Sequence, residues 1–600
     1  MTVTWRSLRR PLPQFLLAWL LGAAIYAPGT GGPFLFDDWP NIGVNPKLQM
    51  DGFDRASIAR ALDGAPQGTG NRPLSFLSFA LQHGGGPTAM KASNIALHLL
   101  IGIGILVLLR RLLPSLLPDT ADARCRRWLP VLAAGAWLLH PLHVSTVLYT
   151  VQRMTQLSTL CVIAGCLIYA GWRARQLGGE AVSPMRAPVG VALLGGIGYL
   201  CKENAALLPV MLLVIEGAAF RFAAPARGPA WFRPALIAYL LLPTLLILAY
   251  LLRAALAWDT PLTHRDFTVA ERLMTQPRVL WMYLGWITWP LPDQLSFYHD
   301  TLRASRGLMS PVTTLPALLA WLAAVAGALV ALRHHRWRLP AFGLLWFLAG
   351  HAIESTSLAL EMVFEHRNYL PSLGPILVIA WAVLALSRRL PARVAPLAVG
   401  GLLWVLPSAL LAEHVAHWSA RSSLMRHAVE SRPESPRAWS SLAQYLLDTG
   451  KIDQALLALR RADALADGNA NFVMAEIIVR CGIDDPIEPR TVDRAIRHLA
   501  AGKVHSPAAR LWRNLGEYCV GRERYAEPMV RLLQAASGHP DDKLAGLAAY
   551  LLSLQLAAQG RLDAALDAVR QAARRDPGEP AVAAWTAELQ RRIAASGGDR

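Results

Sequence analysis

The sequence is poor in charged residues. Asp, Glu, Lys and Arg make up 17% of its 600 residues, against about 25% in an average soluble domain. Apolar residues make up 54%, which excludes a disordered or fibrous chain and argues against a soluble multidomain enzyme. The shortage of charge is confined to the part before Trp418, where uncharged runs of 13 or more residues recur. The sequence therefore predicts a multi-pass membrane domain (1–417) followed by a soluble domain (418–600).

The six cysteines include no Cys-x-x-Cys pair and have no histidine at zinc-ligand spacing. This absence argues against a structural zinc site or a thiol redox centre. Cys161 and Cys166 lie in an apolar run and are expected to pack as small core residues. Cys481 and Cys519 could pair if the soluble domain lies in an oxidising compartment, and the sequence leaves that pairing open.

Long apolar runs fill the first two thirds of the chain. A helix that spans a bilayer needs about 20 mainly apolar residues. By this measure the sequence predicts eleven spans, at 14–30, 94–112, 128–141, 145–172, 188–201, 204–220, 235–256, 312–332, 339–353, 369–386 and 395–416. The stretch 279–290 is rich in Trp and Tyr, which predicts an interfacial or re-entrant helix. Met1–Ala27 also fits a signal peptide, with basic residues before a short apolar core.

Basic residues set the predicted orientation. Residues 1–417 carry 34 Lys and Arg against 19 Asp and Glu, a net charge of +15, and the remainder carries 25 against 22, a net charge of +3. In the membrane domain the basic residues gather in every second loop, as at 124–127 and 333–338. The positive-inside rule then predicts a cytoplasmic N-terminus and, because the number of spans is odd, a periplasmic C-terminal domain at a bacterial inner membrane. The expected partner of the excess charge is the lipid bilayer, since no nucleic-acid-binding motif is present.

The first predicted outer loop, 31–93, opens with FLFDDWPNIGVNP. Asp37 and Asp38 follow the first apolar run directly and stand between Phe36 and Trp39. Desolvation by the aromatic neighbours and mutual repulsion disfavour the doubly ionised pair and raise its proton affinity. One of the two carboxylates is therefore suited to act as a general base.

Five further segments carry polar residues beside apolar runs: NRPLSFLSFALQH (71–83), KASNIALHLL (91–100), HPLHVSTVLYTVQRMTQLS (140–158), YLCKENAALLP (199–209) and FEHRNYLPSLG (364–374). In this order, FDDWPNI, HPLH, KEN and EHRNYLP resemble the membrane half of the transmembrane and tetratricopeptide-repeat O-mannosyltransferase-like proteins. These form a branch of the GT-C glycosyltransferases, which use polyprenyl-phosphate sugars. The resemblance covers most of residues 14–417. Ser145 stands where that family is expected to have an acidic residue, so the resemblance does not fix mannose as the transferred sugar.

The resemblance implies that an acceptor hydroxyl attacks the anomeric carbon while polyprenyl phosphate leaves. Such a reaction needs a carboxylate to take the proton and cations to stabilise the phosphate. Asp37 is the predicted base, and Asp38 is predicted to hold the acceptor or to tune Asp37. The predicted donor-phosphate ligands are Arg72, Arg153, Lys202 and Arg367. For each of these four, a snorkelling or helix-end role is the alternative.

A second group of polar residues is predicted to orient the substrate: His140, His143, Glu203, Glu365 and His366. For the histidines, the alternative is a purely structural role. Glu203 beside Lys202, and Glu365 near Arg367, also fit plain ion pairs. Apart from the polyprenyl-phosphate sugar no cofactor is expected, and no metal, because monophosphate donors lack the pyrophosphate that usually recruits one.

The soluble domain shows amphipathic helices in pairs. Residues 436–465 and 544–577 place small and apolar residues at tetratricopeptide-repeat spacing. A degenerate copy lies at 511–533 and an irregular helical pair at 470–500. We expect an α-solenoid that captures the acceptor polypeptide near the membrane domain, or alternatively one that binds partner subunits or caps the membrane domain.

These features predict an all-α membrane protein with a C-terminal tetratricopeptide-repeat solenoid. The expected activity is that of an inverting glycosyltransferase, which moves a sugar from a polyprenyl-phosphate donor to a hydroxyl of a periplasmic protein or peptide. One alternative is an oligosaccharide transferase or polymerase that uses a lipid diphosphate. An alternative of another class is a non-enzymatic, membrane-anchored tetratricopeptide scaffold for envelope assembly.

Overall fold

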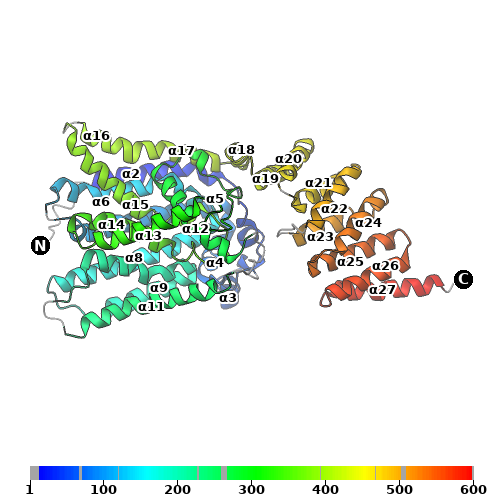
Figure 1. Cartoon of the computed structure of the whole chain (residues 1–600), viewed down its shortest axis with the longest axis horizontal. Helices are drawn as coiled ribbons and strands as arrows, with labels where there is room; N and C mark the ends of the chain where they lie inside the picture. Colours follow the sequence, from blue (N-terminus) through cyan, green and yellow to red (C-terminus); the bar gives the residue numbers. More distant parts are fainter. Residues whose placement is uncertain are drawn as a thin grey trace. The chain divides into compact units, whose positions relative to one another are not determined.

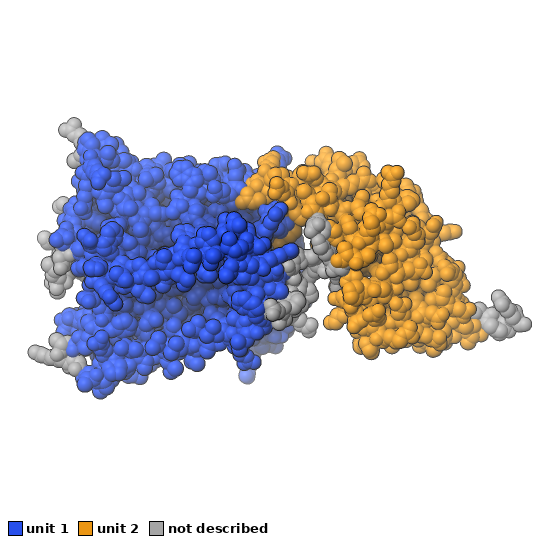
Figure 2. Space-filling model, in the orientation of Figure 1, with its two compact units in different colours: residues 1–427 blue, residues 428–600 orange. Residues whose placement is uncertain are grey.

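The computed structural model describes residues 12–66, 70–118, 120–225, 229–258, 267–391, 394–466, 468–501 and 508–597. The basic residues of the alternative signal peptide lie outside these ranges. The chain forms two compact units, Met1–His427 and Ala428–Arg600 (Figure 2). Their division falls inside α18 (Arg421–Ser431), shortly after the predicted boundary at Trp418. The described residues form helices and no β-strand, with a single isolated bridge between Gly307 and Ser310.

The helices of the first unit are α2 (Leu12–Tyr26), α3 (Arg55–Leu62), α4 (Pro73–Ala80), α5 (Gly86–Leu116), α6 (Ala123–Leu138), α7 (Val144–Val147), α8 (Arg153–Leu177), α9 (Arg186–Cys201), α10 (Leu208–Ile215), α11 (Phe232–Ala255), α12 (Val269–Thr288), α13 (Thr314–Ala331), α14 (Arg338–His351), α15 (Leu373–Leu386), α16 (Ala395–Gly400) and α17 (Leu406–Trp418). Short helical turns that matter for the site are η1 (Ala27–Gly31), η6 (Thr150–Gln152), η7 (Glu203–Leu207) and η11 (Glu365–Asn368). The long helices run side by side, and α3 and α4 lie at one end of this bundle (Figure 1).

Seven helical segments of the described residues are long and apolar enough to cross a membrane: Leu12–Gly31, His83–Leu116, Thr150–Leu177, Glu203–Phe220, Phe232–Ala255, Thr314–Ala331 and Leu397–Trp418. Each overlaps a predicted span. The other four predicted spans correspond to α6, α9, α14 and α15, whose 14 to 16 residues fall short of that length. The chain therefore has the helices of a multi-pass membrane protein, and the count of eleven spans stays a prediction.

Two of these helices leave apolar faces uncovered. Leu242 and Leu246 of α11 are 61% and 63% exposed, and Leu322 and Leu329 of α13 are 59% and 55% exposed. Apolar faces of this size are unfavourable in water and suit contact with lipid hydrocarbon. The packing thus agrees with the apolar composition of these segments.

Most of the predicted stretch 279–290 belongs to a longer helix, α12, which ends at Thr288. This helix begins at a capping box, in which Thr268 and Glu271 each bond the other's backbone. Trp281 stacks on Trp321 of α13, with ring centroids 4.5 Å apart. Its depth in the membrane stays a prediction.

The second unit consists of α19 (Pro436–Asp448), α20 (Ile452–Leu465), α21 (Ala470–Gly482), α22 (Pro489–Ala500), α23 (Ala508–Tyr518), α24 (Ala526–Ser537), α25 (Asp542–Ala558), α26 (Leu562–Arg575) and α27 (Pro580–Gly597). Gly450, Gly521 and Gly560 stand between successive helices with φ of 73°, 83° and 73°. This left-handed conformation ends a helix and is cheap only for glycine. The recurring glycine of the predicted repeats therefore marks a recurring turn between paired helices.

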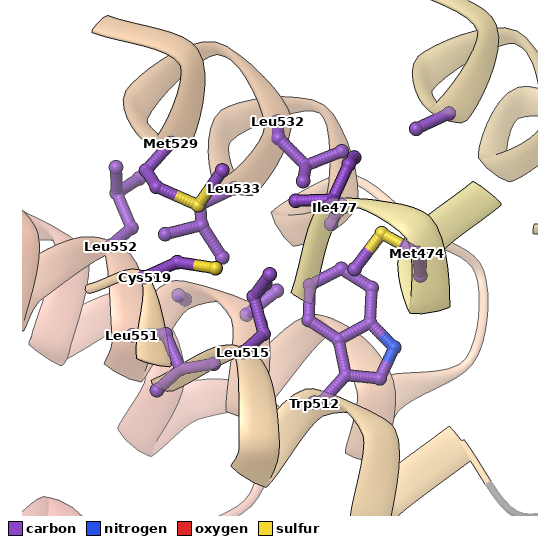
Figure 3. Close-up of a cluster of buried hydrophobic side chains, with 14 of the residues drawn as sticks. Met474, Ile477, Trp512, Leu515, Cys519, Met529, Leu532, Leu533, Leu551 and Leu552 are labelled. Atoms are coloured by element: carbon purple, nitrogen blue, oxygen red, sulfur yellow. The ribbon is translucent and has the colours of Figure 1, made fainter. Parts of the chain in front are cut away.

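The core of the second unit is continuous from α21 to α27. Ile477, Leu515 and Leu533 have no exposed surface, and Figure 3 shows them meeting between successive helices together with Met474 and Trp512. Cys481 and Cys519 form a disulfide, with Cα atoms 5.2 Å apart. The bond joins the end of α21 to the end of α23, so the pairing that the sequence left open is present in the structure.

Candidate functional site

The two adjacent acids of the first outer loop have opposite environments. The Asp38 carboxylate is fully buried and accepts hydrogen bonds from the backbone N–H groups of Leu35 (3.0 Å), Thr150 (3.4 Å) and Val151 (2.7 Å). Asp37 is exposed, and its backbone N–H donates to the Tyr149 hydroxyl at 2.8 Å. Asp38 therefore fastens the loop, and Asp37 is the exposed acid of the pair, whose side chain also hydrogen-bonds the Tyr149 hydroxyl. A role for Asp38 in holding the acceptor does not fit this burial.

Burial raises the pKa of the Asp38 carboxyl to about 7. The hydrogen bonds from Leu35 and Val151, and the positive charge of Lys91, lower the pKa and oppose that effect without cancelling it. The expected rise in proton affinity thus falls on Asp38, the acid that the sequence did not choose as the base. Phe36, just before the pair, has φ of 39°, a strained backbone that the packing around it must maintain.

Lys91 is a buried residue near this loop that the sequence did not single out. Its ammonium has no hydrogen-bond partner among the described residues. A Cβ placed on Gly32 would lie 2.8 Å from the Lys91 Nζ and 2.5 Å from the Trp418 carbonyl oxygen. Only glycine fits there, so the loop, α5 and the end of α17 pack closely around the ammonium. The glycine pair before the acids was the available signal for this close approach.

Three of the four predicted phosphate ligands belong to one charged cluster. Arg72 pairs with Glu203 at 3.0 Å, and Lys202 pairs with Glu354 at 3.2 Å and donates to the Thr155 hydroxyl at 2.9 Å. Arg367 lies over the Phe364 ring at 5.4 Å and donates to the Met362 carbonyl at 3.0 Å. Three cations thus face two carboxylates, which leaves a net positive charge.

Electrostatics tie Arg367 to the Lys202–Glu354 pair. Burial by itself would raise the pKa of the Glu354 carboxyl, but the charges of Lys202 and Arg367 outweigh it and hold that pKa well below its usual range. Burial lowers the pKa of Lys202, against the attraction of Glu354. Burial and the Lys202 charge also place the pKa of His366 far below its ordinary value, so this ring is neutral near pH 7.

One short segment connects the acidic loop to the cationic cluster. Thr150 and Val151 bind Asp38, Met154 accepts from Arg72 through its sulfur at 3.4 Å, and Thr155 accepts from Lys202. Val151 and Thr155 are four residues apart, which is about 6 Å along a helix. The segment 149–155 therefore holds both groups in a fixed relation.

Aromatic rings make a second connection. Phe297 stacks on Phe36 with centroids 3.9 Å apart and an interplanar angle of 17°. It also contacts Tyr149 at 5.4 Å, Phe364 at 6.2 Å and Trp418 at 6.4 Å. Rings from four other segments thus meet at Phe297, a residue that sequence reasoning missed. No spacing in the sequence signals it, because these four partners are distant along the chain.

Arg153 lies outside this site. Its guanidinium is buried and bonds the Asn94 side chain at 2.8 Å and the carbonyls of Ser78 and Met90 at 3.0 and 2.8 Å. These partners use the donors that a phosphate would need. The prediction that Arg153 binds the donor phosphate is corrected by this geometry, which gives it the structural role of joining α4, α5 and α8.

His140 and His143 are also structural. The His140 ring bonds the Ile287 carbonyl and the Leu142 N–H, and the His143 ring bonds the Trp137 carbonyl at 2.9 Å and the Ser372 hydroxyl at 3.0 Å. Both rings are buried and both nitrogens of each are engaged. The structural alternative therefore describes the hydrogen bonds of both rings, and their role in orienting the substrate stays a prediction.

The predicted glutamate pairs have different partners from those expected. Lys202 is extended, with φ of −160° and ψ of 144°, so its side chain and that of Glu203 point apart. Glu203 pairs with Arg72 and Lys202 with Glu354. Glu365 faces His299 at 3.9 Å, and the described structure contains no ion pair between Glu365 and Arg367.

Arg272 of α12 supports the loop that carries Glu354. Its buried guanidinium donates to the carbonyls of Glu354 (2.7 Å), Thr356 (2.8 Å), Leu360 (2.6 Å) and Glu361 (2.9 Å). One side chain thereby satisfies four backbone acceptors of an irregular loop. This role is invisible in the sequence because it depends on contacts more than 80 residues away.

Among the described residues, no three His, Cys, Asp or Glu side chains converge closely enough to hold a metal ion. The chain matches no protein-family model, no curated protein and no solved structure.

Proposed function

We propose that this protein is an inverting glycosyltransferase of the GT-C kind that moves a sugar from a polyprenyl-phosphate donor to a hydroxyl of a periplasmic protein. One observation carries the proposal. The segment 149–155 contacts the exposed Asp37 through Tyr149, and it contacts two cations of the net-positive cluster, Arg72 and Lys202, through Met154 and Thr155. A base and a phosphate-binding cluster at a fixed separation are what transfer from a lipid phosphate requires.

The chemistry assigns a role to each group. Asp37 takes the proton of the acceptor hydroxyl as its oxygen attacks the anomeric carbon. The bond from that carbon to the phosphate oxygen breaks, and its electron pair leaves with the polyprenyl phosphate. Arg72 and Arg367 offer planar donors and Lys202 a point charge to the developing phosphate charge. Attack opposite the leaving group inverts the configuration of the sugar.

The proposed setting is a bacterial inner membrane crossed eleven times, with a periplasmic tetratricopeptide-repeat domain. The disulfide between Cys481 and Cys519 supports a periplasmic location, because disulfides persist in oxidising compartments. The repeated helical pairs with left-handed glycine turns support a solenoid, whose proposed task is to hold the acceptor polypeptide.

The test compares the variants Asp37→Asn, Asp38→Asn and Asp51→Asn. Each purified full-length protein is assayed with the lipid donor and a periplasmic fraction as the source of acceptors. We expect Asp37→Asn to lower the turnover by roughly 10²–10⁴, with membrane insertion unchanged. Asp51, 97% exposed on the same loop, is the control. Full activity of Asp37→Asn would refute the mechanism, and transfer of a multi-sugar block would favour the lipid-diphosphate alternative. Restoration of a deletion strain by residues 418–600 alone would favour the scaffold.

A further inference from the structure

His299 and Glu365 form a pair that is buried but unsatisfied. The His299 Nε2 lies 3.9 Å from the Glu365 Oε1, and the two side chains are 8% and 4% exposed. Neither atom has a hydrogen-bond partner among the described residues. A separation of 3.9 Å is too long for a hydrogen bond, and leaving such atoms unpaired in the interior costs free energy. Each of the two atoms therefore needs a further polar atom as its hydrogen-bond partner.

A single oxygen satisfies both atoms. An oxygen about 2.8 Å from each would see them at an angle of roughly 90°. A hydroxyl suits this position, because it accepts from an imidazole N–H and donates to a carboxylate. A metal ion does not suit it, since no third His, Cys, Asp or Glu of the described residues joins the pair.

The chain neighbours of the pair lie between the proposed base and the proposed phosphate cluster. Phe297, two residues before His299, stacks on Phe36, which precedes Asp37. Phe364, which precedes Glu365, contacts Phe297 and lies under Arg367. The Trp286 ring packs on His299 at 4.8 Å. Aromatic rings around a few hydrogen-bonding groups are typical of sites for small polar ligands.

In the proposed reaction the sugar of the donor lies between the acceptor hydroxyl and the phosphate. We infer that His299 and Glu365 bind a ring hydroxyl of this sugar, an inference that rests on the proposed glycosyltransferase function. His299 donates through Nε2–H, and the sugar hydroxyl donates to Glu365 Oε1. Glu365 is available for this because it forms no ion pair with Arg367 in the described structure. The pair thus contributes to the choice of sugar.

The test uses full-length protein in lipid nanodiscs with undecaprenyl-phosphate mannose, glucose and galactose, and with monodeoxy analogues of the sugar that is transferred. We expect Glu365→Gln and His299→Gln each to raise the KM for the donor 10- to 100-fold, with a smaller effect on kcat. The double variant should be little worse than either single variant, because both residues hold one hydroxyl. Glu413→Gln, an exposed glutamate of α17, is the matched control and should behave as wild type.

The deoxy analogues identify the hydroxyl. One analogue should be 10- to 100-fold poorer than the parent donor for the wild type but no poorer for Glu365→Gln. Two results would overturn the inference. In one, the loss of donor use from removing a hydroxyl multiplies with the loss from Glu365→Gln at every ring position; in the other, Glu365→Gln matches wild type. In either case the pair holds an ordered water only.

Donor binding without turnover separates this inference from the proposed function. Thermal stabilisation by the three donor lipids is measured in Asp37→Asn and in Asp37→Asn combined with Glu365→Gln. A sugar-dependent shift that needs Glu365, together with no transfer by the wild type, would refute the function and keep the subsite. Transfer by the wild type without any such shift would refute the subsite alone.

Discussion

The carboxylate of Asp38 and the backbone N–H of Val151 form a 2.7 Å hydrogen bond between residues 113 positions apart. With the bonds from Leu35 and Thr150 it joins the first outer loop to the entrance of α8. Asp37 is left at the surface of this joint, and Arg72 and Lys202 bind the next turn of the same segment. The position of the proposed base is therefore set by the buried acid beside it.

Asp38 should make stability depend on pH. Its pKa is about 7 in the folded protein and about 3.9 in an unfolded chain, so between these values the folded state binds more protons. The free energy of unfolding should then fall as pH rises from 4 to 7, by at most about 1.4 kcal/mol per pH unit. Thermal unfolding of wild type and Asp38→Asn should show wild type losing stability relative to the variant between pH 5 and pH 8. Parallel curves over this range would contradict the assignment.

Replacing only one residue of the Lys202–Glu354 ion pair should destabilise the folded protein strongly. Glu354→Gln leaves a buried ammonium without its counter-charge, which should lower the free energy of unfolding by about 3–5 kcal/mol. Replacing both residues, as Lys202→Met with Glu354→Leu, should recover much of that loss, because no buried charge remains. Unfolding of the single and double variants measures the coupling. Donor turnover should stay low in the double variant, since the cluster has lost a cation.

Substitution of Arg153 should lower the free energy of unfolding and leave the KM for the donor unchanged. Arg153→Lys keeps the charge but loses the fork that bonds Asn94, Ser78 and Met90, at a cost of roughly 1–3 kcal/mol for each buried acceptor left unpaired. The KM for the donor in the folded fraction should match wild type, whereas Arg72→Lys should raise it. A raised KM in Arg153→Lys with unchanged unfolding would restore the phosphate role that the sequence suggested.

The oxidation state of the cysteines indicates whether the second unit lies in an oxidising or a reducing compartment. Cys481 and Cys519 are bonded, and Cys125, Cys161, Cys166 and Cys201 are free thiols. Membranes that are denatured without reductant should therefore show four alkylated cysteines per chain, and six after reduction. Six in both samples would place this unit in a reducing compartment. Changing both bonded cysteines to serine should lower the free energy of unfolding of this unit by about 3–4 kcal/mol.

Several elements of the site follow from local sequence. The apolar helices of the first unit and the paired amphipathic helices of the second depend on neighbouring residues, so the sequence predicts them. The partners of the polar groups do not. Lys202 and Glu203 are adjacent, yet each pairs with a residue from another segment, because extended backbone turns neighbouring side chains apart.

The sequence by itself determined that the chain is helical, that its first part is apolar enough for a membrane and that its polar motifs lie between apolar segments. These properties depend on composition and on periodicity along the chain. The tertiary structure decided which acid is buried, that Arg153, His140 and His143 are structural, and that Phe297 and Arg272 support the site. Burial and pairing depend on contacts between distant segments, and the free energy of a charge changes more with those contacts than with the identity of its neighbours.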